Sequence, residues 1–153
     1  MGETFAEVWE SSRHNEWSGY YSATFWSGVV AIAIVAFVPR AWLRRTMKVI
    51  AVVGFAWVAS DFASFEISEK WRIRHEWGEA HPELMNEENR YANTVDGANL
   101  TLGPLIMGLE ALVLLFVVAV ATELLTTWWA FYRRLNSRTR SPRDAEPQKQ
   151  ELN

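Results

Sequence analysis

The chain has 153 residues, of which 50% are hydrophobic, and a formal net charge of −3. It contains no cysteine, which excludes disulfides, thiolate metal sites and a cysteine nucleophile. Very apolar stretches alternate with strongly charged segments, and this segregation is typical of an integral membrane protein.

The first segment, residues 1–21, is expected to be an outer amino-terminal tail. It carries Glu3, Glu7, Glu10 and Glu16 against a single basic residue, Arg13. A secretory signal begins with basic residues, so this acidic start predicts that no cleavable signal peptide is present.

Three apolar stretches predict transmembrane helices at residues 22–42, 49–65 and 100–129. The first has no charge from Ser22 to Val38, and with its flanking aromatic residues it reaches the roughly 20 residues that cross a bilayer. A soluble helical bundle would need polar stripes that the second and third stretches lack. The predicted fold class is therefore all-α, a polytopic membrane protein with three transmembrane helices.

The charges of the connecting segments predict the orientation. The loop at 43–48 is basic, and Arg40 just before it adds a further positive charge. The tail at 130–153, which is expected to be flexible, begins with several arginines. Short basic segments stay on the cytoplasmic side. Three helices then place the amino terminus outside and the carboxyl terminus in the cytoplasm.

The segment at 66–99 is expected to form an acidic outer helix and loop. The second span continues as a helix until Gly78 and Pro82, and one short helix follows before a turn at Asp96 and Gly97. This segment is too small for a catalytic domain, and its size suits a cap or a docking surface.

Carboxylates inside the spans are the main candidate functional residues, because an acid at the centre of a membrane helix costs roughly 2.5 to 3.5 kcal/mol. Asp61 lies about 20 Å from Lys48 along the second span, and Glu110 could lie at a comparable depth and face it. Glu123, near the inner end of the third span, could snorkel to the interface, or pair with Arg133 or Arg134 if the helix bends back.

Two interpretations of Asp61 and Glu110 remain open at this stage. In the favoured one, each is a neutral acid that hydrogen-bonds to a neighbouring helix or to a partner subunit. In the other, the two carboxyls share a proton or bind a cation.

Two further sets of residues are assigned from their spacing and position. Small residues spaced for close helix packing are Ala23, Ser27, Ala31, Ala56, Ser60, Ser64, Gly103, Gly108 and Ala111. Aromatic residues expected at the membrane interface are Trp26, Trp42, Trp71, Trp77, Trp128 and Trp129.

All three histidines lie outside the predicted spans, which argues against a haem held by two intramembrane histidines. His75 and His81, with Glu76 and Glu79, could form a divalent-metal site, but scattered His and Glu in an acidic loop more often have no such role. We expect no metal site, no required cofactor, and at most a bound lipid or pigment. No catalytic motif is present, and a membrane enzyme that uses the outer histidines is the least favoured interpretation.

The sequence favours a small non-catalytic membrane subunit that stabilises or extends a larger complex, with an energy-transducing complex suggested by analogy of size alone. The expected partners are membrane lipids and other integral membrane subunits, and no nucleic acid. The alternative is a homo-oligomeric ion channel or cation/proton transporter in which Asp61 and Glu110 line a shared pathway. The expected location is a bacterial inner membrane or its equivalent.

Overall fold

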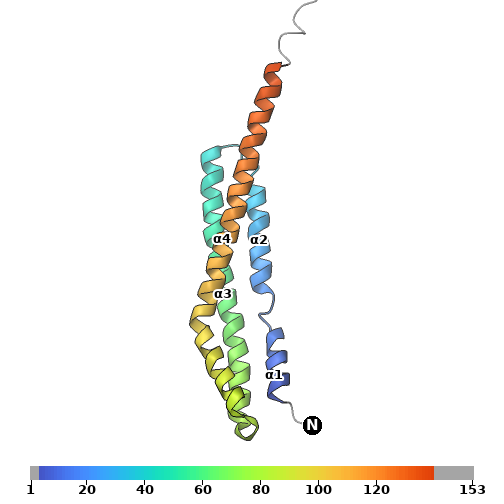
Figure 1. The fold of residues 1–153 in the computed structure, drawn as a ribbon. Coiled ribbons are helices and arrows are strands. Elements are labelled where there is room, and N and C mark those ends of the chain that lie inside the picture. The colour runs from blue at the N-terminus through green and yellow to red at the C-terminus, as the bar shows by residue number, and fades with distance from the viewer. Residues whose placement is uncertain (1–3, 140–153) are drawn as a thin grey trace, which may run out of the picture.

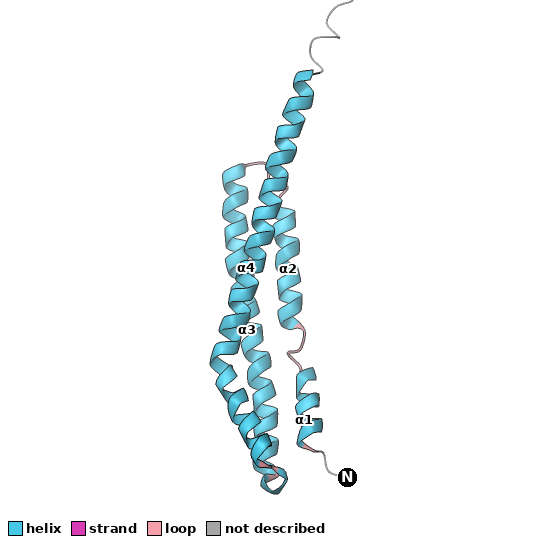
Figure 2. Ribbon diagram, viewed as in Figure 1, coloured by secondary structure: helices cyan, strands magenta, loops and turns pink. Residues whose placement is uncertain are grey.

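The computed structural model describes residues 4–139, and every element in that range is helical. Three helices, α2 (Tyr20–Val35), α3 (Ala41–Ala80) and α4 (Glu87–Thr139), lie side by side as an elongated bundle, and the short α1 (Phe5–Ser11) packs beside one end (Figure 1). Only short connections separate the helices (Figure 2). The prediction of an all-α chain is confirmed for the described residues.

The turn between the first two long helices lies earlier than the sequence predicts. α2 ends at Val35 and α3 begins at Ala41, so the predicted span 22–42 covers parts of two elements. Pro39 explains the position of the turn, because proline cannot continue a helix and disfavours helical backbone in the residue before it. Residues 43–48, expected to be a loop, are the first turns of α3.

The segment at 66–99 is largely helical, which differs from the expected helix and loop. α3 runs through Ala80, and the turn that follows contains a short 3-10 helix, η2 (Pro82–Leu84). α4 then begins at Glu87, where the Asn86 side chain accepts a hydrogen bond from the backbone N–H of Asn89 at 2.7 Å and caps the helix.

The turn expected at Asp96 and Gly97 is absent, because both residues lie inside α4. Gly97 serves close packing instead. A Cβ atom there would lie 3.0 Å from Trp71 Nε1, so the missing side chain allows the Trp71 indole to approach α4.

Pro104 also lies inside α4, where it removes a backbone N–H donor. Such a proline bends a helix, and α4 changes direction along its yellow section (Figure 1). Ser60 Oγ of α3 donates a hydrogen bond to the Pro104 carbonyl at 3.0 Å. The bend is therefore tied directly to the neighbouring helix.

Small and aliphatic residues form the core between the three long helices. One cluster contains Ile32 of α2, Val52 of α3, and Leu115 and Ala119 of α4. A second cluster joins Ala56 and Ala59 to Ala111. Since α2 contributes to the same core as α3 and α4, the three helices form one packed unit.

Most apolar side chains nevertheless face outward. Two helical segments, Ala41–Ala80 and Asn99–Ser137, are long and apolar enough to cross a membrane, and only 22% and 17% of their most apolar windows are buried in the bundle. α2 is also apolar but has only 16 residues. Two candidate membrane-spanning helices with apolar outer surfaces suggest a membrane protein.

The amino-terminal segment contains a docked helix, whereas the sequence predicted a tail. The Thr4 side chain caps α1 and forms a capping box with Glu7. Phe5 and Val8 are buried, and the Phe5 ring lies 5.9 Å from the Trp77 ring of α3. The predicted carboxyl-terminal tail starts as the continuation of α4, and residues 140–153 lie outside the described residues.

Candidate functional site

The buried face of α3 begins and ends with a cation. Its buried residues recur every three or four positions from Lys48 through Val52, Ala56, Ala59 and Ala63, and Arg74 continues the same row. Lys48 and Arg74 are each only 4% exposed. Buried cations need an opposite charge, so both ends of this row depend on carboxylates from α4.

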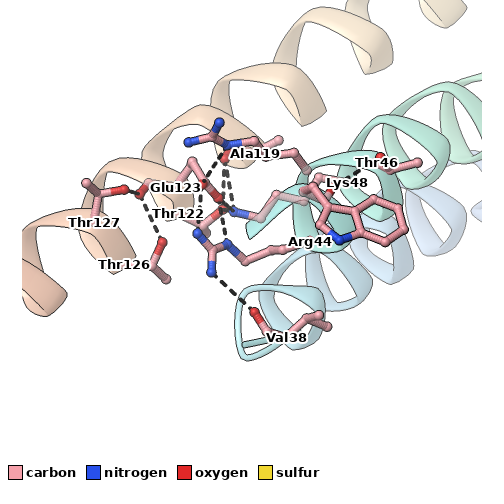
Figure 3. A network of polar contacts seen from close by, with 11 residues as sticks. Val38, Arg44, Thr46, Lys48, Ala119, Thr122, Glu123, Thr126 and Thr127 are labelled. Carbon is pink, nitrogen blue, oxygen red and sulfur yellow. Dashed lines mark hydrogen bonds and ion pairs between the residues drawn. The ribbon is translucent and has the colours of Figure 1, made fainter. Parts of the chain in front are cut away.

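The first group, here called the Glu123 cluster, consists of Arg44, Arg45, Lys48 and Glu123. Arg44 binds both oxygens of Glu123, with Nε–Oε2 at 2.9 Å and Nη2–Oε1 at 2.8 Å. Lys48 Nζ lies 3.2 Å from Oε2, and Arg45 Nε lies 3.2 Å from Oε1. Figure 3 shows Arg44 and Lys48 reaching across from α3 to Glu123. The bidentate arginine fixes the orientation of the carboxylate.

Further contacts connect this cluster to α4 and to the turn that follows α2. Lys48 Nζ donates to Thr122 Oγ1 at 2.8 Å, and Arg44 Nη1 donates to the carbonyl of Val38, just after α2, at 3.2 Å (Figure 3). The Glu123 backbone carbonyl accepts bonds from the hydroxyls of Thr126 and Thr127. From the sequence, Glu123 could either snorkel or pair with Arg133 or Arg134; in the structure its partners come instead from the first turns of α3.

The second group, here called the Arg74 cluster, joins Arg74 to Ser12, Trp9 and Asp96. Arg74 Nε donates to Ser12 Oγ at 2.8 Å, and Nη1 forms an ion pair with Asp96 of α4. The guanidinium also stacks over the Trp9 ring, 3.6 Å from its centroid. One buried arginine therefore holds α1, α3 and α4 together.

The two clusters lie far apart along the bundle. Arg74 follows Lys48 by 26 positions on one straight helical row, which corresponds to roughly 39 Å. A bilayer has a hydrocarbon core of roughly 30 Å and a total thickness of roughly 40 to 45 Å. The distance between the clusters is thus longer than the hydrocarbon core and close to the full thickness.

Asp61 and Glu110 lie between the two clusters at similar heights. Asp61 follows Lys48 by 13 positions, and Glu110 precedes Glu123 by the same number. The structure nevertheless turns the two side chains to different faces. Asp61 is exposed two positions from buried Ala59, on the side of α3 that faces away from the bundle.

Neither carboxylate has a strong partner. Within residues 4–139, Asp61 makes no hydrogen bond or ion pair, and the exposed Glu110 interacts only electrostatically, with Tyr21. The Tyr21 hydroxyl instead donates to the Met107 carbonyl at 3.3 Å. A single copy of the chain therefore does not bring the two candidate carboxylates together.

The predicted packing residues divide between contact and exposed positions. Ala56 and Ala111 are buried, and a Cβ atom on Gly108 would lie 2.8 Å from Ser60. A Cβ atom on Gly103 would meet Ile67 at 2.7 Å, and Ser64 is half-buried. These glycines allow α3 and α4 to approach closely.

On α2 the small-residue row lies beside the contact face instead of on it. Ala23 and Ser27 are exposed and Ala31 is half-buried, while Gly28 and Ile32 are buried. The two rows differ by one position, which turns the helix by about 100°. Spacing alone could not choose between these two neighbouring rows.

The tryptophans also fall into two groups. Trp26, Trp42, Trp128 and Trp129 are exposed, at 63%, 67%, 62% and 51%. Trp71 and Trp77, by contrast, are half-buried and stack on His75 and His81, with ring centroids 4.5 and 4.7 Å apart. Trp71 also lies against Gly97 of α4, and Trp77 lies against Phe5 of α1.

The hairpin end carries several ion pairs. Arg72 bridges Glu69 and Glu76, and its guanidinium lowers the pKa of Glu69 below the usual value. His75 Nε2 lies 3.3 Å from Glu79. In the described range, no three His, Asp or Glu side chains converge to hold a metal ion.

The sequence analysis did not identify Arg74, Asp96 or the role of Arg44. A signal for Arg74 was present, because the buried row of α3 continues to this residue when the helix is extended past Phe65. Its partner could not be found in the same way, since Asp96 was assigned to a turn.

Comparisons with protein-family models, with curated proteins and with solved structures found no match to this chain.

Proposed function

We propose that this chain is a small non-catalytic integral membrane subunit that crosses the bilayer three times and stabilises or extends a larger membrane complex. A bacterial inner membrane or its equivalent is the proposed location. Other integral membrane subunits are the proposed partners, and the analogy with energy-transducing complexes rests on size and architecture.

The observation that carries the proposal is the unpaired carboxylate of Asp61 on the outer face of α3. Asp61 lies roughly 20 Å from Lys48, within an apolar run that ends at Phe65. An acid at membrane depth costs roughly 2.5 to 3.5 kcal/mol unless it is paired or hydrated. A partner helix that supplies a hydrogen-bond donor to Asp61 would remove this cost.

The carboxyl-terminal part of α4 supports a partner as well. It extends beyond the turn that joins α2 and α3 (Figure 1), and its side chains are exposed at Trp128, Trp129, Phe131 and Leu135. Exposed apolar surface on a helix without neighbours in its own chain is a typical protein or membrane interaction surface.

Three membrane crossings are supported by the packing of α2. This helix measures roughly 24 Å, somewhat less than the hydrocarbon core, but it shares a core with α3 and α4 at the same height. If those two helices cross the bilayer, α2 must be embedded beside them. Its short length is compatible with a small local thinning of the bilayer.

Orientation is testable because the chain has no cysteine. We propose that the amino terminus and the α3–α4 hairpin lie outside, since the basic Glu123 cluster is expected on the cytoplasmic side. In intact cells, a membrane-impermeant maleimide should label Glu83→Cys at once and Ser137→Cys only after permeabilisation. The opposite order would reverse the proposed orientation.

The partner contact is tested with Asp61→Asn and Glu110→Gln in the full-length chain. Loss of co-purifying membrane proteins, with no ion flux through the wild type in liposomes, supports a subunit. Glu88→Gln is the matched control, because Glu88 is an exposed acid of α4 near the hairpin end. If Asp61→Asn and Glu110→Gln co-purify partners as well as the wild type and the Glu88→Gln control do, Asp61 and Glu110 do not contact a partner.

The alternative is a homo-oligomeric channel or cation/proton transporter. The same exposed carboxylates favour it, because copies of Asp61 and Glu110 could meet around a shared pathway. In this case Asp61→Asn would abolish ion flux while the oligomer stays intact.

A further inference from the structure

A groove between α3 and α4 is the starting point of this inference. It has a volume of about 550 Å³, and residues of α3 and α4 alone line it. Its walls are apolar and outward-facing, and they include Val49, Val53, Val113, Phe116 and Val120. The stretch of α4 from Leu112 to Glu123 gives it a height of roughly 17 Å.

The Glu123 cluster closes one end of this groove, where Arg45, Lys48 and Glu123 contribute to the lining. Three cations surround one carboxylate there, so the cluster has a net charge of +2. Arg45 is the accessible member, since its side chain is 68% exposed. Its Nε donates to Glu123, and its two Nη groups make no hydrogen bond within the described residues.

We propose that this groove binds an anionic phospholipid, with one acyl chain along the valines and the headgroup phosphate against Arg45. The apolar walls and the adjacent excess of positive charge match the two parts of such a lipid. Basic pockets between membrane helices on the cytoplasmic side are a recurrent form of lipid-headgroup site. This inference rests on the membrane placement proposed above.

The charge balance selects the lipid class. A net charge of +2 attracts a phosphate that carries a negative charge, and the guanidinium of Arg45 offers its two Nη groups as donors to the phosphate oxygens. A zwitterionic lipid brings its own cation to the same place and loses most of this attraction. We therefore expect phosphatidylglycerol to bind more tightly than phosphatidylcholine.

Native mass spectrometry of the full-length chain, released from micelles that contain either lipid, tests the headgroup contact. We expect a one-to-one adduct with phosphatidylglycerol and about a fivefold weaker adduct for Arg45→Gln, which is the effect of one cation near a membrane surface. Arg40→Gln is the matched control, because Arg40 is exposed at the same end and its side chain has no partner in the described range.

A second pair of variants tests the groove. Val113→Trp fills the groove, whereas Val117→Trp places the same side chain at a position of α4 outside the groove. The two valines are 52% and 56% exposed, so both variants should fold. The phosphatidylglycerol adduct should be lost only in Val113→Trp.

Equal adducts with both lipids, or equal adducts in Arg45→Gln and Arg40→Gln, would overturn the headgroup assignment. Retention of the adduct in Val113→Trp would overturn the groove. These failures are separable from a failure of the proposed function, because co-purification of partner subunits is measured separately, on protein extracted from its own membrane.

Discussion

The Glu123 cluster provides the sharpest prediction, made with the substitution Glu123→Gln. The carboxylate accepts hydrogen bonds from three cations, and Lys48 and Arg44 have side chains only 4% and 13% exposed. The amide of glutamine keeps the shape of the side chain but removes the only negative charge. Lys48 and Arg44 are then left buried without a counter-charge.

The magnitude follows from burial. Breaking a buried ion pair by removing one partner costs roughly 3 to 5 kcal/mol. The Glu123 side chain is 19% exposed, and the exposed Arg45 can turn into solvent, so we expect a loss of about 2 to 4 kcal/mol in the free energy of unfolding. Glu76→Gln is the control: it breaks an exposed pair with Arg72 and should cost at most about 1 kcal/mol.

Unfolding of the purified protein in mixed micelles, followed by tryptophan fluorescence as the fraction of dodecyl sulfate rises, measures both variants. Adding Lys48→Met to Glu123→Gln removes one uncompensated buried charge and should recover about 1 to 2 kcal/mol. If Glu123→Gln loses no more stability than Glu76→Gln, the charges of the Glu123 cluster do not stabilise the bundle.

Three further predictions concern other parts of the bundle. Arg74→Met should release α1, seen as faster hydrogen exchange confined to residues 5–14, and unchanged exchange there would contradict the role of the Arg74 cluster. Gly108→Ala should cost about 1 to 3 kcal/mol in the same unfolding assay because its Cβ would lie 2.8 Å from Ser60 Oγ, whereas Gly54→Ala, with nothing within 4 Å, should stabilise by about 0.5 to 1 kcal/mol. Hydrogen bonds from Thr4 lower the pKa of Glu7 below its ordinary value of 4.5, so its contribution to α1 is complete above pH 4.5 and is lost as the pH falls through the folded pKa. The protection of the α1 amides, corrected for the intrinsic exchange rate at each pH, should therefore fall on acidification in the wild type, and this fall should be smaller in Glu7→Gln.

The helical class and the apolar segments were predictable because they depend on composition over long windows. The exact turns were harder. Pro39 fixes the turn between α2 and α3, but the predicted span was extended past it to the aromatic Trp42, so the boundary was placed too late.

The pairing of charges could not be predicted from the sequence, because it depends on which helices are neighbours. Glu123 lies ten positions before Arg133 in the chain, yet its partners are more than 70 positions away on α3. Asp96 and Gly97 resemble a turn in sequence, whereas their roles, an ion pair with Arg74 and space for Trp71, exist only in the assembled hairpin.

Membership of a larger membrane complex, as proposed for this chain, can be measured by native mass spectrometry of the tagged full-length protein, extracted gently from its own membrane. We predict co-release with unlike membrane chains at a fixed ratio, and weaker co-release for Asp61→Asn. Release as a monomer, or as a symmetric oligomer of this chain alone, would show that the chain is not such a subunit.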